Sequence, residues 1–306
     1  MECVPFEESA IGDYQSRFAW DAVAAELVGT ALDRWHLEAG EAFVGGAAAC
    51  VLRVTRSDGS PAVLKVGYPH VEGIWEAVGL EVCAGIAPAV LRQDPWTWTM
   101  LLEDISPGLP LSRAAMPAER AIEIGASVHL ELSSRRVPDG LPPLAVAMDE
   151  YARNTEHRMP GQAAALDALG VRALVERAVH ELRALATTSE DVALLHGDFN
   201  PGNLLQSGAD RWVVIDPKPM RGEPEFDLWP LVTQLGSPWS NPHPERVLSA
   251  QLEAAASIAR CDPHRAARWA FARTGINISW YIEEGQRAAA ETEAAALRIW
   301  ERVLAA

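Results

Sequence analysis

The sequence contains little that suggests a disulfide framework, a membrane span or secretion. Only four cysteines occur among 306 residues, widely spaced and without a CxxC pair, which indicates isolated reduced thiols. No apolar run reaches the roughly 18 residues that a membrane-spanning helix needs. The first dozen residues are acidic and lack a basic segment followed by an apolar one. We therefore expect no signal peptide, no membrane partner and a cytoplasmic location.

Positive charge is also scarce. Lys and Arg number 26 against 42 Asp and Glu, which gives a net charge of -16 at pH 7. Binding to a phosphate backbone requires clustered Lys and Arg, so this balance argues against a nucleic-acid partner. An acidic chain favours a cationic small molecule, although acidity that serves solubility alone is the simpler explanation of the composition. Nothing in the composition indicates an oligomeric state.

Several well-known catalytic signatures are missing. The chain has no GxGxxG and no GxxxxGK[S/T], the glycine-rich loops of dinucleotide and P-loop nucleotide sites. It has no HExxH, which argues against a zinc hydrolase, and no GxSxG, which argues against an α/β-hydrolase. A nucleotide site, if present, must be built in another way.

The pattern of elements changes after about residue 103. Before it, short extended segments and turn signals predict a small antiparallel sheet carrying two helices. We expect helices at 17–35 and 72–84, a hairpin of 50–56 with 62–66 around the turn Ser57–Pro61, and a strand pair at 89–92 and 96–102.

Helical periodicity dominates the remainder, apart from β-like residues at 204–205 and 212–215. We expect helices near 117–132, 145–158, 163–187, 226–235, 244–260, 263–284 and 286–304. The fold class is therefore α+β, with a domain at 1–103, a larger helical domain at 104–306 and a connection at about 102–107.

The most informative segment is Leu194–Leu205, which reads LLHGDFNPGNLL. It presents His196, Asp198 and Asn203, and an apolar run leads to Asp216 thirteen residues after Asn203. Transfer of a phosphoryl group to an alcohol needs a carboxylate that orients the hydroxyl and takes its proton. It also needs an amide oxygen and a second carboxylate that hold magnesium beside the triphosphate. Taken singly, Asn203 belongs to an ordinary surface turn and Asp216 to a strand end, but their conjunction favours a kinase.

A second group of residues lies upstream. Lys65 stands inside the otherwise apolar segment Ala62–Val66, where a charge is costly without partners. In a kinase this lysine would hold the α- and β-phosphates and pair with a carboxylate on the following helix. Glu76 is our first choice for that partner, and Glu72, one turn earlier, stays open. The alternative for Lys65 is an edge-strand lysine that deters aggregation.

At this point the motifs resemble those of the aminoglycoside phosphotransferases, in the branch containing streptomycin 6-kinases and hydroxyurea phosphotransferases. The resemblance covers most of the chain and rests on motifs that read HGDFNPGN, VIDPKP, GEPEFDLWP, AVLKV, TMLLE and WYIEEG. It implies a protein-kinase-like fold of two lobes, the smaller one an antiparallel sheet and the larger one helical.

The resemblance also implies roles for individual residues. In this resemblance Asp198 occupies the position of the catalytic base and Lys65 that of the phosphate anchor. Asn203 and Asp216 occupy the positions of the magnesium ligands, and ATP is the implied donor. Further implied residues are the adenine-binding backbone at Leu102, Glu103 and Asp104, a phosphate-covering loop that begins at Gly45 and Gly46, and structural support from His196 and Asp227. For Asp227, a helix N-terminal acid that interacts with the dipole is the alternative.

Residues 145–160 and 270–287 line the acceptor cleft by analogy with the family. Carboxylates there would receive ammonium or guanidinium groups, and an aromatic ring would border them, although each residue fits a solvated helix face as well. The candidates are Asp149, Glu150, Glu283, Glu284 and Trp280.

The sequence therefore predicts an ATP- and Mg²⁺-dependent phosphotransferase that acts on a hydroxyl of an aminoglycoside-type antibiotic, with streptomycin first. Hydroxyurea, an amino sugar or another small metabolite is the alternative acceptor, since acceptor choice depends on a few side chains. A non-catalytic nucleotide-binding pseudokinase is the remaining hypothesis, and the presence of Lys65, Asp198, Asn203 and Asp216 argues against it.

Overall fold

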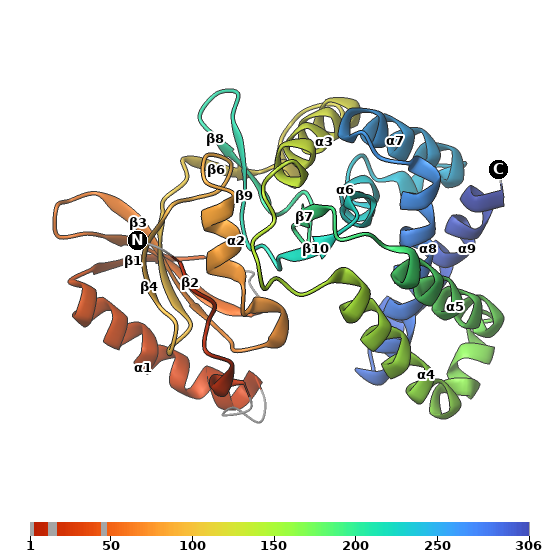
Figure 1. The fold of residues 1–306 in the computed structure, drawn as a ribbon, viewed down its shortest axis with the longest axis horizontal. Helices are drawn as coiled ribbons and strands as arrows, with labels where there is room; N and C mark the ends of the chain where they lie inside the picture. The colour runs from red at the N-terminus through yellow and green to blue at the C-terminus, as the bar shows by residue number, and fades with distance from the viewer. Residues whose placement is uncertain (1–2, 12–16, 44–47, 306) are drawn as a thin grey trace. The chain divides into compact units, whose positions relative to one another are not determined.

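The computed structural model describes residues 3–11, 17–43 and 48–305, and its contacts divide the chain into two compact units (Figure 1). The first unit comprises Met1–Arg113 and Gly202–Pro219, and the second comprises Ala114–Pro201 and Met220–Ala306. The domains expected at 1–103 and 104–306 remain a prediction. The compact units differ from them because the first unit runs on to Arg113 and takes in Gly202–Pro219.

A five-stranded antiparallel sheet forms the centre of the first unit. Its strand order is β1-β2-β3-β5-β4. The strands are β1 (Glu38–Ala42), β2 (Ala49–Thr55), β3 (Pro61–Gly67), β4 (Val90–Asp94) and β5 (Thr99–Glu103). The structure confirms the two expected strand pairs. The sequence did not predict β1, because all five of its side chains are exposed and give no alternation of apolar and polar residues.

Helix α1 (Arg17–Trp35) covers one face of this sheet (Figure 1). Trp20 and Trp35 of α1 pack in one apolar cluster with Leu64 and Val66 of β3. Successive side chains of a strand point to opposite faces. Lys65, between Leu64 and Val66, is therefore directed away from α1.

The short helix α2 (Glu76–Val82) carries the carboxylate expected to meet Lys65. The helix predicted at 72–84 is wrong in its first part, where residues Val71–Gly73 form the separate 3-10 turn η2. The turn packs tightly, because a Cβ at Gly73 would lie 2.7 Å from the His70 ring and 3.1 Å from the Trp98 ring. Glu72 and Glu76 therefore do not share one helix face.

A second small sheet brings a late part of the sequence into the first unit. It has the order β6-β8-β9, with β6 (Pro107–Pro110), β8 (Leu204–Ser207) and β9 (Trp212–Val214). The Val214 N–H donates to the Ile86 carbonyl oxygen at 2.7 Å, which ties β9 to the segment that follows α2. The 3-10 turns η1 (Glu8–Ala10) and η3 (Leu111–Arg113) complete the described part of this unit.

Helices make up most of the second unit. They are α3 (Ala118–Ser133), α4 (Leu144–Ala168), α5 (Arg172–Thr188), α6 (Leu228–Thr233), α7 (Pro244–Ala259), α8 (Pro263–Glu283) and α9 (Arg287–Ala305), with 3-10 turns η4 (Pro224–Asp227) and η5 (Pro238–Ser240). The buried Trp269 of α8 packs in a core cluster with residues of α4 and α5. Four expected helices agree with these bounds to within one residue, those at 117–132, 244–260, 263–284 and 286–304.

The boundary between α4 and α5 differs from the expected one. The sequence predicted a break between 158 and 163, a gap that contains Pro160, which cannot donate a helical hydrogen bond. The structure instead continues α4 through Pro160 to Ala168, since Gln162 and Leu166 beyond it are buried. The break comes at Gly170, whose φ of +65° is the left-handed conformation that ends helices. The region of the expected helix at 226–235 is divided between the 3-10 turn η4 and the helix α6.

A two-stranded ladder of the second unit leads into the segment that bears Asp198. β7 (Ala193–Leu195) pairs antiparallel with β10 (Met220–Gly222), so Leu195 lies opposite Met220. The chain leaves this unit after β7 and returns at β10. In the described ranges, no helix is both long and apolar enough to cross a membrane.

Candidate active site

Lys65 lies between two carboxylates in the first unit. Strand β3 is an inner strand in which Lys65 pairs with Val51 of β2 and Met100 of β5. The Lys65 Nζ lies 2.5 Å from Glu76 Oε1 and 2.6 Å from Asp216 Oδ1, and its side chain is only 12% exposed. An edge-strand lysine would need neither partner. The inner position and the two ion pairs favour a site residue.

The electrostatics of this group keep the lysine charged. Burial alone would lower the pKa of Lys65, but the charges of Glu76 and Asp216 hold that pKa above its ordinary value. Burial raises the pKa of Glu76, although the Lys65 ammonium beside it acts in the opposite direction. A permanent cation with a buried carboxylate partner suits a group that binds an anionic phosphate.

Of the two carboxylates that the sequence left open, Glu76 contacts Lys65. Glu72 instead lies 3.1 Å from the ammonium of Lys218, and both of those side chains are about one-third or more exposed. Lys218 follows Asp216 by two residues. The segment after Asp216 is therefore attached to η2, just before α2.

Asn203 and Asp216 occupy the same end of the β8–β9 hairpin. Asn203 precedes β8 and Asp216 follows β9, and the Ile215 N–H donates to the Asn203 carbonyl oxygen at 2.9 Å. The Asp216 backbone has a φ of +58°, a conformation that Asp tolerates better than most residues. The pair offers an amide oxygen and a carboxylate, the hard oxygen ligands that Mg²⁺ prefers.

No larger metal cluster accompanies this pair. Among residues 3–11, 17–43 and 48–305, no group of three or more His, Cys, Asp or Glu side chains is arranged to hold a metal ion. Mg²⁺ ordinarily binds one or two protein oxygens and takes its remaining ligands from phosphates and water. The residues present therefore fit a Mg²⁺ that arrives with a nucleotide.

The segment that follows Asp216 packs directly on α2 at Gly79. A Cβ at Gly79 would lie 2.9 Å from Pro219 Cγ and 3.2 Å from Pro217 Cγ. Proline rings cannot rotate away as flexible side chains do. The absence of a side chain at Gly79 is therefore what allows α2 and the Asp216 segment to approach so closely.

Gly79→Ala is expected to lower the free energy of unfolding by about 1–3 kcal/mol, because the added methyl overpacks this contact. The sign is informative, since alanine in place of glycine ordinarily stabilises a helix by up to about 1 kcal/mol. Gly29→Ala in α1 is the matched control, because a Cβ there meets no atom within 4 Å. Urea unfolding should show opposite signs for the two variants, and two gains of stability would contradict the packing argument.

The predicted adenine-binding residues end strand β5. The Glu103 N–H already donates to the Ala89 carbonyl oxygen at 2.9 Å, and the Glu103 carboxylate accepts the Ala89 N–H at 3.1 Å. Asp104 accepts two hydrogen bonds from Arg53, at 3.0 and 3.2 Å. The predicted adenine contacts therefore rest on the other backbone groups of 102–104. The phosphate-covering loop expected at Gly45 and Gly46 lies outside the described residues.

In the second unit, Asp227 fixes the backbone just before Asp198. The Asp227 carboxylate accepts the His196 N–H at 2.6 Å and the Gly197 N–H at 3.0 Å. Asp227 is fully buried, and this burial raises its pKa to about 7 against the lowering effect of the two N–H donors. The alternative of a helix N-terminal acid does not explain two hydrogen bonds to residues thirty positions away.

Asp198 itself is held by its neighbours in the loop. Its N–H donates to His196 Nδ1 at 3.3 Å, and its Oδ1 accepts from Asn200 Nδ2 at 2.9 Å. Gly197 has a φ of +80°, which a side chain would strain. The loop therefore presents a partly exposed carboxylate on a backbone that is fixed from both sides.

The sequence analysis missed His129, a fully buried residue of α3. Its ring contacts Phe199 edge-on at 5.4 Å, and Phe199 contacts His196 in the same way at 5.7 Å. The His129 Nε2 donates to the Pro224 carbonyl oxygen at 3.0 Å, and burial lowers the pKa of His129 to about 4. A neutral histidine therefore links α3 to the residue after Asp198 and to the turn that bears Asp227.

Glu223 is a second residue that sequence reasoning missed. Its carboxylate accepts two hydrogen bonds from Arg265 Nε, at 2.8 and 2.7 Å, and one from the Trp269 indole N–H. Burial raises the pKa of Glu223. A carboxylate between Gly222 and Pro224 gave no periodic signal, but it anchors the start of η4, four residues before Asp227.

The acceptor candidates do not gather at one place in the second unit. Asp149 forms an ion pair with Arg153 on its own helix at 3.1 Å, and Glu150 is exposed. At the end of α8, Glu283 accepts from Gln162 at 3.3 Å, Glu284 is exposed, and Trp280 is 47% exposed.

The helix contacts show how far apart these two sets lie. Arg273 of α8 stacks over Tyr151 of α4 at 4.6 Å, whereas Ser279 of α8 meets Gln162 of α4 at 2.8 Å. Asp149 therefore stands level with the middle of α8. The ten residues from Arg273 to Glu283 span about 15 Å of helix, which separates the two pairs of carboxylates.

A half-buried carboxylate on α9 makes a pH-dependent contribution to stability. Burial raises the pKa of Glu293 to about 7, although a hydrogen bond from Asn277 and the charge of Arg273 act in the opposite direction. The unfolded chain releases this proton near pH 4. Between about pH 4 and 7 the folded state binds more protons than the unfolded state, so stability falls as pH rises through that window.

When the pH is raised from 5 to 8, the free energy of unfolding of Glu293→Gln is expected to fall by about 1–3 kcal/mol less than that of the parent, because the neutral amide does not titrate. Urea unfolding of the ligand-free protein at both pH values measures this difference. Glu291→Gln is the matched control, since Glu291 is an exposed residue of the same helix. If the free energy of unfolding of Glu293→Gln falls with pH as steeply as that of the parent, this carboxylate does not cause the pH dependence.

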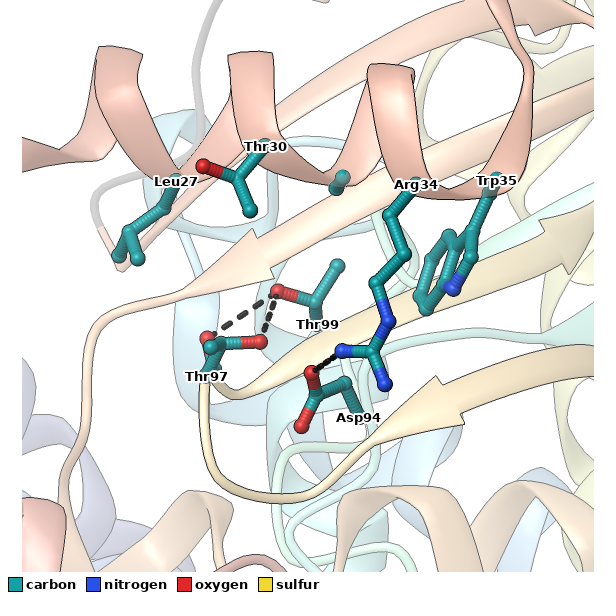
Figure 2. A pocket seen from close by; sticks show the side chains of 8 residues that line it. Leu27, Thr30, Arg34, Trp35, Asp94, Thr97 and Thr99 are labelled. Atoms are coloured by element: carbon teal, nitrogen blue, oxygen red, sulfur yellow. Dashed lines mark hydrogen bonds and ion pairs between the residues drawn. The ribbon is translucent and has the colours of Figure 1, made fainter.

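One small cavity of the first unit lies on the other face of the sheet (Figure 2). It has a volume of about 40 Å³ and lies between α1 and the β4–β5 hairpin. Figure 2 shows Arg34 reaching from α1 to Asp94, beside the hydroxyls of Thr97 and Thr99. A volume of this size holds water rather than a substrate. Because α1 lies on the face away from Lys65, this cavity is not part of the site.

Solved structures show the fold to which this chain is similar. A choline/ethanolamine kinase family protein from Mesorhizobium loti matches with a TM-score of 0.62 and 18% identity, over 94% of this chain and 98% of that one. An amicoumacin kinase in complex with AMP-PNP and Ca²⁺ matches with a TM-score of 0.61 and 14% identity, over 94% and 96%. The expected α+β, protein-kinase-like fold is thereby confirmed.

The chain belongs to the aminoglycoside/hydroxyurea antibiotic resistance kinase family, whose model matches residues 34–285. Two curated relatives illustrate the range of that family. Streptomycin 6-kinase of Streptomyces glaucescens is 34% identical over 92% of this chain and 91% of its own length. Hydroxyurea phosphotransferase of Kitasatospora aureofaciens is 31% identical over 88% and 76%. The chain is accordingly a phosphotransferase, and the resemblance inferred from its motifs is confirmed.

Proposed function

We propose that this chain transfers the γ-phosphoryl group of ATP to a hydroxyl of streptomycin or a closely similar aminoglycoside. The observation that carries this proposal is the 34% identity to a streptomycin 6-kinase over about nine-tenths of both chains. A second streptomycin 6-kinase, from Streptomyces griseus, is 29% identical over a similar share. The site geometry supports phosphoryl transfer, and the relatives supply the acceptor.

Asp198 is the proposed general base. Its carboxylate would accept the proton of the acceptor hydroxyl as that oxygen forms a bond to the γ-phosphorus. The bond between the γ-phosphorus and the bridging oxygen then breaks, and ADP leaves with the electron pair. The support is the placement of Asp198 on a loop braced by Asp227 and Asn200. A braced carboxylate loses little freedom when it orients a substrate.

Lys65, held by Glu76, is the proposed anchor of the nucleotide phosphates. Asn203 and Asp216 are the proposed Mg²⁺ ligands. The metal would neutralise phosphate charge, which electrostatically favours the transition state. Asp216 also contacts Lys65, so in our proposal a metal-binding carboxylate and the phosphate anchor adjust to each other when nucleotide binds. Adenine would contact backbone groups among Leu102, Glu103 and Asp104.

The acceptor site is proposed to draw on one of the two separated sets of carboxylates. Glu283, Glu284 and Trp280 share the end of α8, whereas Asp149 and Glu150 share α4. A cationic acceptor of this size needs several contacts, because one exposed ion pair contributes only about 0–1 kcal/mol. ATP is abundant in the cytoplasm, where we propose that the protein acts.

Hydroxyurea is the second candidate acceptor, favoured by the 31% identity to a hydroxyurea phosphotransferase. A non-catalytic role is less well supported, because Lys65, Asp198, Asn203 and Asp216 are all present.

The deciding experiment measures ADP release from Mg-ATP with streptomycin, other aminoglycosides, hydroxyurea and amino sugars. We expect the highest specificity constant with streptomycin, and phosphorus NMR of the product identifies the hydroxyl that is modified. A higher constant with hydroxyurea would transfer the assignment to the second candidate. Nucleotide binding without turnover of any acceptor would contradict both.

A further inference from the structure

The first residues of the chain form a strap across the first unit, which the sequence did not single out. Residues Cys3–Glu7, called the N-terminal strap below, run beside α2 and the β4–β5 hairpin, as the dark red trace in Figure 1 shows. The family model matches only from residue 34 onward. The strap therefore lies outside the part of the chain by which the family is recognised.

Several contacts fasten the strap to the β4–β5 hairpin. Phe6 is only 3% exposed, and its ring stacks on that of Trp98 with centroids 5.0 Å apart. The Gln93 side chain accepts the Val4 N–H at 3.2 Å and donates to the Val4 carbonyl oxygen at 2.7 Å, as a neighbouring strand would. The Trp98 indole N–H also donates to the Glu7 carbonyl oxygen at 3.0 Å.

The strap also holds α2 near both of its ends. The Phe6 N–H donates to the carbonyl oxygen of Ile74, two residues before Glu76, at 2.8 Å. The Cys3 N–H donates to the carboxylate of Glu81, near the end of the helix, at 2.7 Å. α2 has only seven residues and no side-chain N-cap. A helix this short depends on such tertiary contacts, because its own hydrogen bonds barely offset the cost of nucleation.

α2 connects the strap to Lys65 through Glu76. Glu76 lies in its first turn, and Glu76 Oε1 is 2.5 Å from Lys65 Nζ. A shift of α2 by even 1 Å would lengthen this ion pair beyond hydrogen-bonding distance. Lys65 would then turn toward Asp216 alone.

We propose that the N-terminal strap is a positioning element for nucleotide binding, which sets Glu76 and through it Lys65. This inference rests on the proposed function in one respect, that a nucleotide binds at Lys65. Coupling between two sites is reciprocal. A docked strap therefore strengthens nucleotide binding, and bound nucleotide keeps the strap docked.

The Cys3 end of the strap is loosely packed, which allows it to release. A cavity of about 230 Å³ lies beside Cys3, between α2 and β4. Cys3 is itself buried, and burial raises the pKa of its thiol to about 11. The docked thiol is therefore unreactive, and a released strap would expose it. Reactivity of Cys3 thus reports on docking.

The first test compares two alanine variants of the strap in the full-length protein. Phe6→Ala removes the buried anchor, whereas Val4→Ala changes a side chain that is 47% exposed and serves as the matched control. We expect Phe6→Ala to weaken binding of AMP-PNP about tenfold, within the usual range of coupling between sites, with the KM of the acceptor unchanged. Gln93→Leu, which leaves the aromatic stack intact, should weaken AMP-PNP binding in the same direction.

The second test uses the unsubstituted protein. A thiol reagent is applied with and without AMP-PNP, and labelling of Cys3 and Cys261 is followed by mass spectrometry. We expect nucleotide to slow labelling of Cys3 several-fold and to leave Cys261, in the second unit, unchanged. If nucleotide only suppressed global unfolding, labelling of both cysteines would slow together.

Two outcomes would overturn the inference. The first is a Phe6→Ala protein that is less stable but binds AMP-PNP with parental affinity, since the strap would then be structural only. The second is a Cys3 labelling rate that nucleotide does not change. Both outcomes are distinct from failure of the proposed function, because direct AMP-PNP binding needs no acceptor and does not depend on turnover.

Discussion

Replacing Asp198 by asparagine is expected to lower turnover at least about 10²-fold, the range for loss of a positioned general base. The amide has the same shape, and its oxygen can still accept the hydrogen bond from Asn200, which Asp198 Oδ1 receives at 2.9 Å. It cannot take a proton from the acceptor hydroxyl. The fold and the affinity for nucleotide should therefore persist, and the KM for ATP should change little.

ADP release with the best acceptor of the panel measures this loss, and binding of AMP-PNP confirms that the site is intact. Asp210→Asn makes the same chemical change in an exposed turn twelve residues later and should keep parental turnover. Turnover within about threefold of the parent for Asp198→Asn, with an intact fold, would remove Asp198 from the role of base.

Lys65→Met is expected to reduce kcat/KM for ATP by at least about 10²-fold, comparable to loss of one preorganised charge-stabilising group. The substitution keeps an unbranched side chain of similar length on an inner strand. It removes the cation that lies 2.5 Å from Glu76 and 2.6 Å from Asp216. Breaking a buried ion pair costs about 3–5 kcal/mol when the remaining charge stays unpaired. We therefore expect lower stability as well.

A double variant separates the two effects of Lys65→Met. Adding Glu76→Gln removes the unpaired buried charge, so stability should recover while kcat/KM stays low. The matched control is Lys218→Met, because Lys65 and Lys218 are the two lysines of the sequence. Lys218 and its partner Glu72 are both substantially exposed, so its loss should cost less than about 1 kcal/mol. Equal losses of kcat/KM in both variants would contradict a special role for Lys65.

Sequence reasoning was most successful where a residue conflicts with its surroundings. A charge in the apolar segment Ala62–Val66 demanded partners, and the structure supplies Glu76 and Asp216. The β-like residues predicted at 204–205 and 212–215 lie in and next to strands β8 and β9, which pair with each other and bring Asn203 and Asp216 to one end. In both cases a few neighbouring residues carried the information for the prediction.

Long-range packing was beyond such reasoning. The start of α2 depends on the rings of His70 and Trp98 around Gly73, which no periodicity reveals. His129 resembles any apolar-face histidine of a helix until Phe199 and Pro224 are placed beside it. Strands β7 and β10 have three residues each and are recognised as strands only because they pair with each other. These features depend on contacts between residues far apart in the chain.

The excursion of Gly202–Pro219 between β7 and β10 has a consequence for how the protein is made. A chain emerging from the ribosome usually completes its N-terminal domain first. Here the first unit lacks β8, β9 and Asp216 until about two-thirds of the chain has been synthesised. Until then Lys65 has Glu76 but not Asp216, and strand β6 has no partner in β8. The first unit therefore cannot mature as an independent nascent domain, and its completion has to wait for residues that are translated after the whole of α3, α4 and α5.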